Sequence, residues 1–176
     1  MDQVLVDFDL GAAWFFGIHP DKVREQDRGW DLTKLFKVSW EEFHTKVDLV
    51  GEDFWANLPE LPWYEDLIQL CYRYTDEVCF LTSPSDFDIA SCAIGKRRWL
   101  LDRGYHNEMF ITKDKQSFAS TGTLLIDDRK ENCQSFCDSG GMAVLFPSYA
   151  NQFSSQVGRL NQVENHMQRL VSYYKE

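Results

Sequence analysis

The chain has 176 residues, of which 44% are apolar and 15% aromatic, with only 10 Gly and 5 Pro. This composition supplies the core of one domain and excludes disordered, collagen-like and low-complexity chains. The net charge of −10 disfavours a stable nucleic-acid partner, because such binding depends on Lys and Arg that neutralise phosphates. Because the chain has no long apolar run and no N-terminal basic region, we expect a soluble, cytoplasmic protein with no secretion signal and no membrane partner.

Short apolar runs rich in β-branched residues predict the strands. Continuous apolar runs separated by helical patterns are typical of a mainly parallel sheet that helices cover on both faces. The runs lie at residues 4–6, 78–81, 109–111, 124–126 and 142–146.

Segments with apolar residues every three or four positions predict the helices. They lie at residues 65–74, 88–103 and 157–174. The last segment is expected to close the fold by packing on the sheet. Together with the strands, these helices predict the α/β class.

The stretch from 19 to 62 breaks this alternation. It contains no convincing strand, but it has helix-like segments at 21–27 and 39–47 and many aromatic residues. We therefore expect a small helical cap, at approximately residues 15–64, inserted after strand 1. Ligands bind at the carboxyl edge of open α/β sheets, so the cap is expected to lie beside the site.

The domain organisation follows from this insertion. One domain spans residues 1–176, and its α/β core consists of residues 1–14 and 65–176. No internal repeat or linker interrupts it.

Two acidic pairs follow predicted strands. Asp7 and Asp9 end the segment V-L-V-D-F-D, and because strand residues two apart point the same way, we expect their carboxylates to share a cation. Asp127 and Asp128 follow the run L-L-I, where burial is costly unless a metal, a lysine or backbone donors neutralise them. Other interpretations stay open: a D-x-D of nucleotide-sugar transferases or a solvated loop for the first pair, and a helix N-cap by Asp128 for the second.

Hydroxyl and amino groups follow two more strands. Thr82 and Ser83 stand in F-L-T-S-P-S, which suits a phosphate-binding corner as well as an ordinary turn. Lys113 and Lys115 stand in F-I-T-K-D-K, and one of them would balance the charge of the four aspartates. A surface position in water is the ordinary alternative for either lysine.

The cysteines point to an intracellular protein. Their number is five, and an odd count indicates reduced thiols. Cys133 and Cys137 lie one helical turn apart, but no further Cys or His pair has the spacing of a zinc site, so zinc is not expected.

In chain order the strand ends carry Asp-x-Asp, Thr, Lys and Asp-Asp. This order resembles the four motifs of the haloacid dehalogenase (HAD) superfamily of aspartate-nucleophile phosphatases. Response-regulator receiver domains have similar parts, but their acidic pair comes first and their phosphorylated Asp stands alone later. The resemblance implies a HAD-like Rossmannoid parallel sheet.

The resemblance narrows to the 5′(3′)-deoxyribonucleotidase family and covers residues 4 to about 146. Its motifs are V-D-F-D, F-W-A-N-L-P-E-L-P, L-T-S-P, G-K-R-R-W-L-L, I-T-K-D-K and L-L-I-D-D-R. It implies that Asp7 is the nucleophile and Asp9 the general acid and base. It further implies Mg²⁺ held by Asp7, by the backbone carbonyl of Asp9 and by Asp128, with Asp127 in support.

The same resemblance assigns the substrate contacts. Thr82, Ser83 and Lys115 match the phosphate binders, whereas Phe15 and Trp30 match the aromatic residues that contact the base. The spacing from Lys115 to the last motif is longer than usual in the family, which leaves Lys113 as a rival.

The implied function is a Mg²⁺-dependent phosphomonoesterase that forms an aspartyl-phosphate and releases phosphate from deoxynucleoside monophosphates. The alternatives are a HAD phosphatase of another small phosphomonoester or of a polynucleotide 3′-phosphate, and a catalytically quiet phosphate-binding relative. Leu10 stands where the family usually has Gly, which motivates the last alternative. Base and sugar preference, 5′ or 3′ phosphate, and a homodimeric state stay open.

Overall fold

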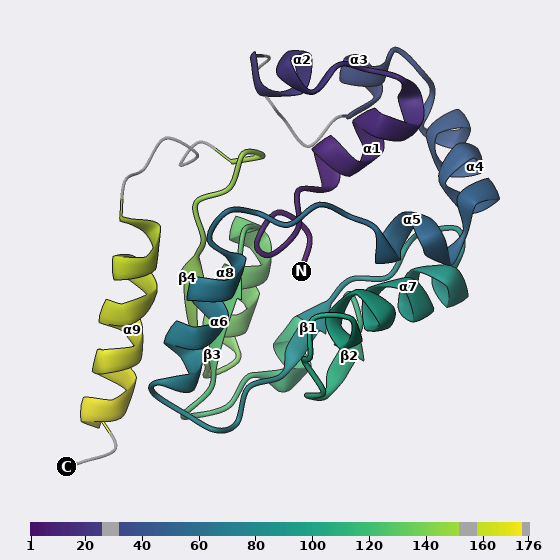
Figure 1. Ribbon diagram of the computed structural model, residues 1–176. Coiled ribbons are helices and arrows are strands. Elements are labelled where there is room, and N and C mark those ends of the chain that lie inside the picture. The colour runs from purple at the N-terminus through teal and green to yellow at the C-terminus, as the bar shows by residue number, and fades with distance from the viewer. Residues whose placement is uncertain (26–31, 152–157, 174–176) are drawn as a thin grey trace.

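The computed structural model describes residues 1–25, 32–151 and 158–173 and is a mixed α/β protein (Figure 1). Its helices are α1 (Phe8–Phe16), α2 (Pro20–Glu25), α3 (Leu32–Phe36), α4 (Trp40–Val50), α5 (Glu52–Ala56), α6 (Tyr64–Tyr72), α7 (Ile89–Leu101), the 3₁₀ helix η1 (Lys115–Phe118), α8 (Lys130–Asp138) and α9 (Arg159–Tyr173). Its strands are β1 (Phe80–Thr82), β2 (Met109–Ile111), β3 (Leu124–Asp127) and β4 (Met142–Leu145). In these described parts, no helix is both long enough and apolar enough to cross a membrane.

The strands form two parallel pairs. β1 pairs with β2, and β3 pairs with β4, so that Thr82 lies opposite Ile111 and Asp127 opposite Leu145. Four of the predicted strands are therefore confirmed, as is their parallel direction. The described strands nevertheless form two sheets of two strands each and not one continuous sheet.

The predicted strand at residues 4–6 is wrong. The backbone N–H groups of Val4, Leu5 and Val6 all donate to the carbonyl of Met1, at 3.1, 2.8 and 3.3 Å, so the chain folds into a tight turn. Gln3 adopts a positive φ of 58° within this turn. The apolar run is buried as predicted, but it forms no named strand. Beyond the turn, it makes one isolated antiparallel bridge, between Val6 and Glu60, and the Leu5 carbonyl accepts from the N–H of Leu61.

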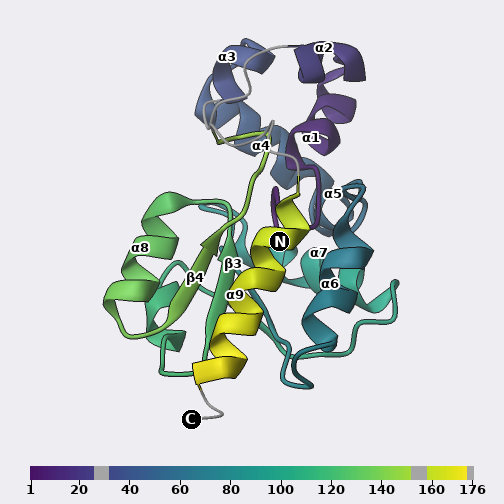
Figure 2. The same ribbon diagram turned by 90° about the vertical axis from the view of Figure 1, so that its left-hand side faces the viewer.

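The last helix packs on the strands, as its amphipathic pattern predicts. Helices α8 and α9 both contact the β3–β4 pair, and α9 also contacts α6; Figure 2 shows α9 running beside these strands. Helix α5 packs closely on α7 at Gly95, where a Cβ atom would lie only 2.3 Å from the carbonyl oxygen of Glu52. This close contact holds α5, which precedes α6, against α7, which follows β1.

Helices α1 to α4 lie together at one end of the molecule, away from the strands (Figures 1 and 2). The helix-like segments at 21–27 and 39–47 correspond to α2 and α4, although residues 26 and 27 lie outside the described part. Phe43 is fully buried, and the ring of Phe16 stacks on it at 5.3 Å, with Phe36 stacked at 5.7 Å on the same ring. Most of the aromatic residues of this region thus form its own small core.

Candidate functional site

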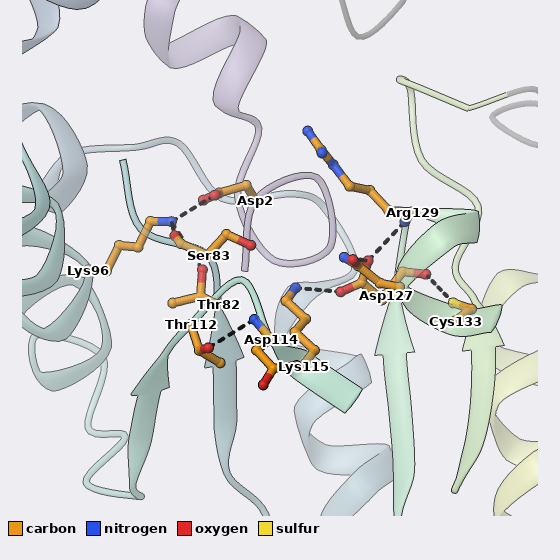
Figure 3. A network of polar contacts seen from close by, with 11 residues as sticks. Asp2, Thr82, Ser83, Lys96, Thr112, Asp114, Lys115, Asp127, Arg129 and Cys133 are labelled. Atoms are coloured by element: carbon orange, nitrogen blue, oxygen red, sulfur yellow. Dashed lines mark hydrogen bonds and ion pairs between the residues drawn. The ribbon is translucent and has the colours of Figure 1, made fainter. Parts of the chain in front are cut away.

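A cavity of about 370 Å³ lies where β1 and β3 end, below the N-terminal turn and beside α4. Residues that are far apart in the sequence meet in its wall because the parallel strands β1 and β3 end at the same level (Figure 3). The predicted site residues in this wall are Asp9, Thr82, Ser83, Lys115, Asp127 and Asp128.

Lys115 is held by a buried ion pair. Its side chain is only 8% exposed, and Nζ lies 2.5 Å from Oδ2 of Asp127 (Figure 3). The other carboxylate oxygen of Asp127 accepts hydrogen bonds from the backbone N–H of Arg129 and from Nδ2 of Asn132, both at 2.9 Å. Lys113 also lines the cavity, but it is exposed and pairs with Asp86. Burial therefore favours Lys115 over Lys113 as the lysine of this site.

The Asp128 carboxylate is buried beside that pair. Its Oδ2 has no hydrogen bond to any described residue. Burial, and then the charge of Asp127, raises the pKa of Asp128 to about 7. The N-cap residue of α8 is Arg129, with no side-chain capping bond, so the helix-cap interpretation of Asp128 is wrong. Asp128 is a carboxylate that a bound cation would stabilise.

Thr82 lies in a second polar cluster that the sequence analysis missed. Lys96 of α7 is 1% exposed, and its Nζ donates to Thr82 Oγ1 at 3.0 Å, to the Ser83 carbonyl at 2.9 Å and to Asp2 Oδ2 at 2.7 Å (Figure 3). The sequence contains a signal for it. Lys96 falls on the buried stripe of α7, four residues after Cys92, where an ordinary surface lysine would not stand.

Asp7 and Asp9 lie at the start of α1 and not at the end of a strand. Both are 3% exposed, but only Asp9 lines the cavity, where its Oδ1 accepts a hydrogen bond from Gln3 Nε2 at 2.6 Å. Asp7 is the N-cap of α1, and its Oδ1 accepts from the backbone N–H of Leu10 at 3.0 Å. The twofold alternation of a strand does not apply here, because a helix begins at Phe8. A cation shared by the two carboxylates stays a prediction.

Phe15, one of the two predicted base contacts, is not in the cavity wall. Phe15 is 43% exposed and packs against Phe54, with ring centroids 5.1 Å apart, outside the residues that line the cavity. Trp30 lies outside the described residues. From α4, Trp40 and His44 line the cavity instead.

The predicted Mg²⁺ ligands fit a metal only in part. Within residues 1–25, 32–151 and 158–173, no group of three or more His, Cys, Asp or Glu side chains is placed to hold an ion. Asp128 offers a buried oxygen without a hydrogen bond, as a ligand would, whereas the carboxylate of Asp7 caps α1.

The comparisons with known proteins leave the family open. No protein family model matches this chain, and no curated protein matches it. The case for a function therefore depends on the cavity itself.

Proposed function

We propose that the protein is a Mg²⁺-dependent phosphomonoesterase of the HAD type, which releases phosphate from deoxynucleoside monophosphates. The observation that carries the proposal is one cavity at the ends of β1 and β3 whose wall contains the buried Lys115, the hydroxyl of Thr82, and the carboxyl groups of Asp9 and Asp128. This combination of a cation, a hydroxyl and carboxylates suits a phosphate ester undergoing hydrolysis.

The phosphate is proposed to bind between Lys115 and Thr82. Both side chains are almost completely buried, and a charged hydrogen bond gains strength where water is excluded. The ammonium group of Lys96 donates to Thr82 Oγ1 at 3.0 Å, which leaves the threonine hydroxyl hydrogen for another acceptor. A phosphate oxygen is an acceptor of this kind.

Asp7 is proposed to act as the nucleophile, and Asp9 as the general acid and base. An oxygen of Asp7 attacks phosphorus, the bond to the leaving oxygen breaks, and Asp9 protonates that oxygen. Asp9 then takes a proton from the water that hydrolyses the aspartyl-phosphate. The attack is assigned to Oδ2 of Asp7, because Oδ1 accepts the capping hydrogen bond from the backbone N–H of Leu10.

Asp128 is the residue proposed to hold Mg²⁺, together with Asp7 and the backbone carbonyl of Asp9. When bound, this ion supplies positive charge that neutralises the phosphate and the clustered carboxylates. The buried Asp128 oxygen without a hydrogen bond supports this assignment.

The test is phosphate release from a panel of deoxynucleoside 5′- and 3′-monophosphates, measured with Mg²⁺ and with EDTA. The variants Asp9→Asn and Thr82→Val should lose activity, whereas Asp76→Asn, at an exposed position outside the cavity wall, should match the wild type. No Mg²⁺-dependent release from any member of the panel would refute the proposal.

One observation favours a second candidate, a phosphate-binding protein without turnover. The proposed nucleophile Asp7 is absent from the cavity wall, whereas the proposed phosphate contacts are present in it. Calorimetric titration with inorganic phosphate separates the two, since the second candidate binds phosphate tightly and releases none from an ester.

A further inference from the structure

His44 of α4 forms part of the cavity wall, as does Trp40 one helical turn earlier. Its ring stacks on Phe87 at 4.2 Å with an interplanar angle of 26°, and Trp40 meets it edge to face at 4.3 Å. Contacts on a face and an edge fix the plane of the imidazole. The ring is thus oriented by its aromatic neighbours and not by hydrogen bonds.

The His44 ring is polar and buried, and none of the described residues forms a hydrogen bond with it. Its residue is 6% exposed, and neither Nδ1 nor Nε2 has a hydrogen bond within the described parts of the chain. Burial lowers the pKa of His44, with the charges of Asp48 and Asp86 acting in the opposite direction. A neutral imidazole carries one N–H donor and one acceptor. Native structures rarely leave such a group unpaired, and a ligand is one of the standard explanations.

We propose that His44 recognises the nucleobase of the substrate through a hydrogen bond from or to a ring nitrogen, while Trp40 packs against the base. This inference rests on the proposed function, because it names the residue that distinguishes a nucleotide from another phosphate ester.

The cavity wall combines two kinds of chemistry, and this combination favours a nucleotide. It contains Lys115 and Thr82, which suit an anion, and the aromatic rings of Trp40 and His44. Trp40 is 44% exposed, so its indole has free surface on which a flat ring can pack. A nucleobase has both a flat face and hydrogen-bonding edges. The volume of about 370 Å³ lies within the usual range for small-molecule sites.

The proposal predicts a selective effect of removing the ring nitrogens. His44→Phe keeps an aromatic ring for Phe87 and Trp40 but cannot form hydrogen bonds. We expect it to raise KM for deoxynucleoside 5′-monophosphates about tenfold, with little change in kcat. It should leave kcat/KM for deoxyribose 5-phosphate, which has no base, unchanged. His44→Gln should recover part of the loss, and His106→Asn, at an exposed site outside the cavity wall, serves as the matched control.

A second measurement does not depend on turnover. In the wild-type protein labelled with ¹⁵N-histidine, addition of a deoxynucleoside without phosphate should shift the ring resonances of His44 and leave those of His106 in place. If His44 resonances do not move and His44→Phe affects both substrates equally, the proposal is overturned. If the wild type releases no phosphate but the His44 resonances shift, base recognition stands and the phosphatase proposal fails.

Discussion

Replacing Asp128 with Asn should stabilise the protein in the absence of divalent metal. Burial and the neighbouring Asp127 raise the pKa of Asp128 from its ordinary 3.8 to about 7. Below pH 4 the Asp128 carboxyl group is protonated in both the folded and the unfolded chain. In this range it therefore does not make the free energy of unfolding depend on pH. Between pH 4 and 7 the unfolded chain ionises first, and stability falls as pH rises. At about 1.4 kcal/mol per pH unit, the loss above pH 7 reaches about 4 kcal/mol.

The assay is urea unfolding of the wild type and of Asp128→Asn from pH 4 to 8 in EDTA. The free energies of unfolding should be similar at pH 4 and should diverge in favour of the variant up to pH 7, after which the difference stays constant. Asp76→Asn, in an exposed loop, controls for the loss of one negative charge. A variant that is less stable than the wild type at pH 8 would refute the reasoning, because it would mean that the ionised Asp128 has a stabilising partner.

Further predictions concern Mg²⁺ binding, the buried Lys96, and Asp7 and Phe15, which do not line the cavity. Mg²⁺ at one hundred times its Kd should raise the unfolding free energy of the wild type by about 2.7 kcal/mol at pH 8 but not that of Asp128→Asn, and equal responses would exclude Asp128 as a ligand. Lys96→Met should destabilise the protein by about 2 kcal/mol in urea unfolding, less than the roughly 3–5 kcal/mol of a fully buried pair, because Asp2 is 33% exposed; an unchanged midpoint would contradict this. Asp7→Asn should lower kcat at least a hundredfold while changing the unfolding free energy by less than about 0.5 kcal/mol, since Asn also caps helices; retained turnover would remove Asp7 as the nucleophile. Phe15→Ala should leave KM for nucleotides unchanged, and a clear rise in KM would show that Phe15 contacts the base after all.

Local patterns predicted much of the secondary structure. The runs 78–81, 109–111, 124–126 and 142–146 became strands because they are apolar on both faces and flanked by amphipathic helices. The same reasoning failed for residues 4–6. That run is just as apolar and is buried, but burial alone does not specify hydrogen bonding, and its N–H groups bond to Met1.

The site residues that follow a strand were predictable from the sequence, whereas the two that come from the middle of helices were not. Thr82 and Asp127 end β1 and β3, so their meeting follows from the parallel arrangement of the strands. Lys96 and His44 come from the middle of helices. The position of Lys96 on the buried stripe of α7 indicates that it is buried, but not where it lies. That both residues reach the cavity depends on the orientation of α7 and α4, which long-range packing determines.

The central claim is that this cavity hydrolyses a phosphate ester with the help of Lys115. The most direct measurement is the initial rate of phosphate release from a deoxynucleoside 5′-monophosphate in Mg²⁺, for the wild type and for Lys115→Met. Since removing one group that stabilises transition-state charge costs about a hundredfold to a thousandfold in kcat, the variant should fall by at least a hundredfold. A folded Lys115→Met protein that releases phosphate at the wild-type rate, or a wild type that releases none, would contradict the account.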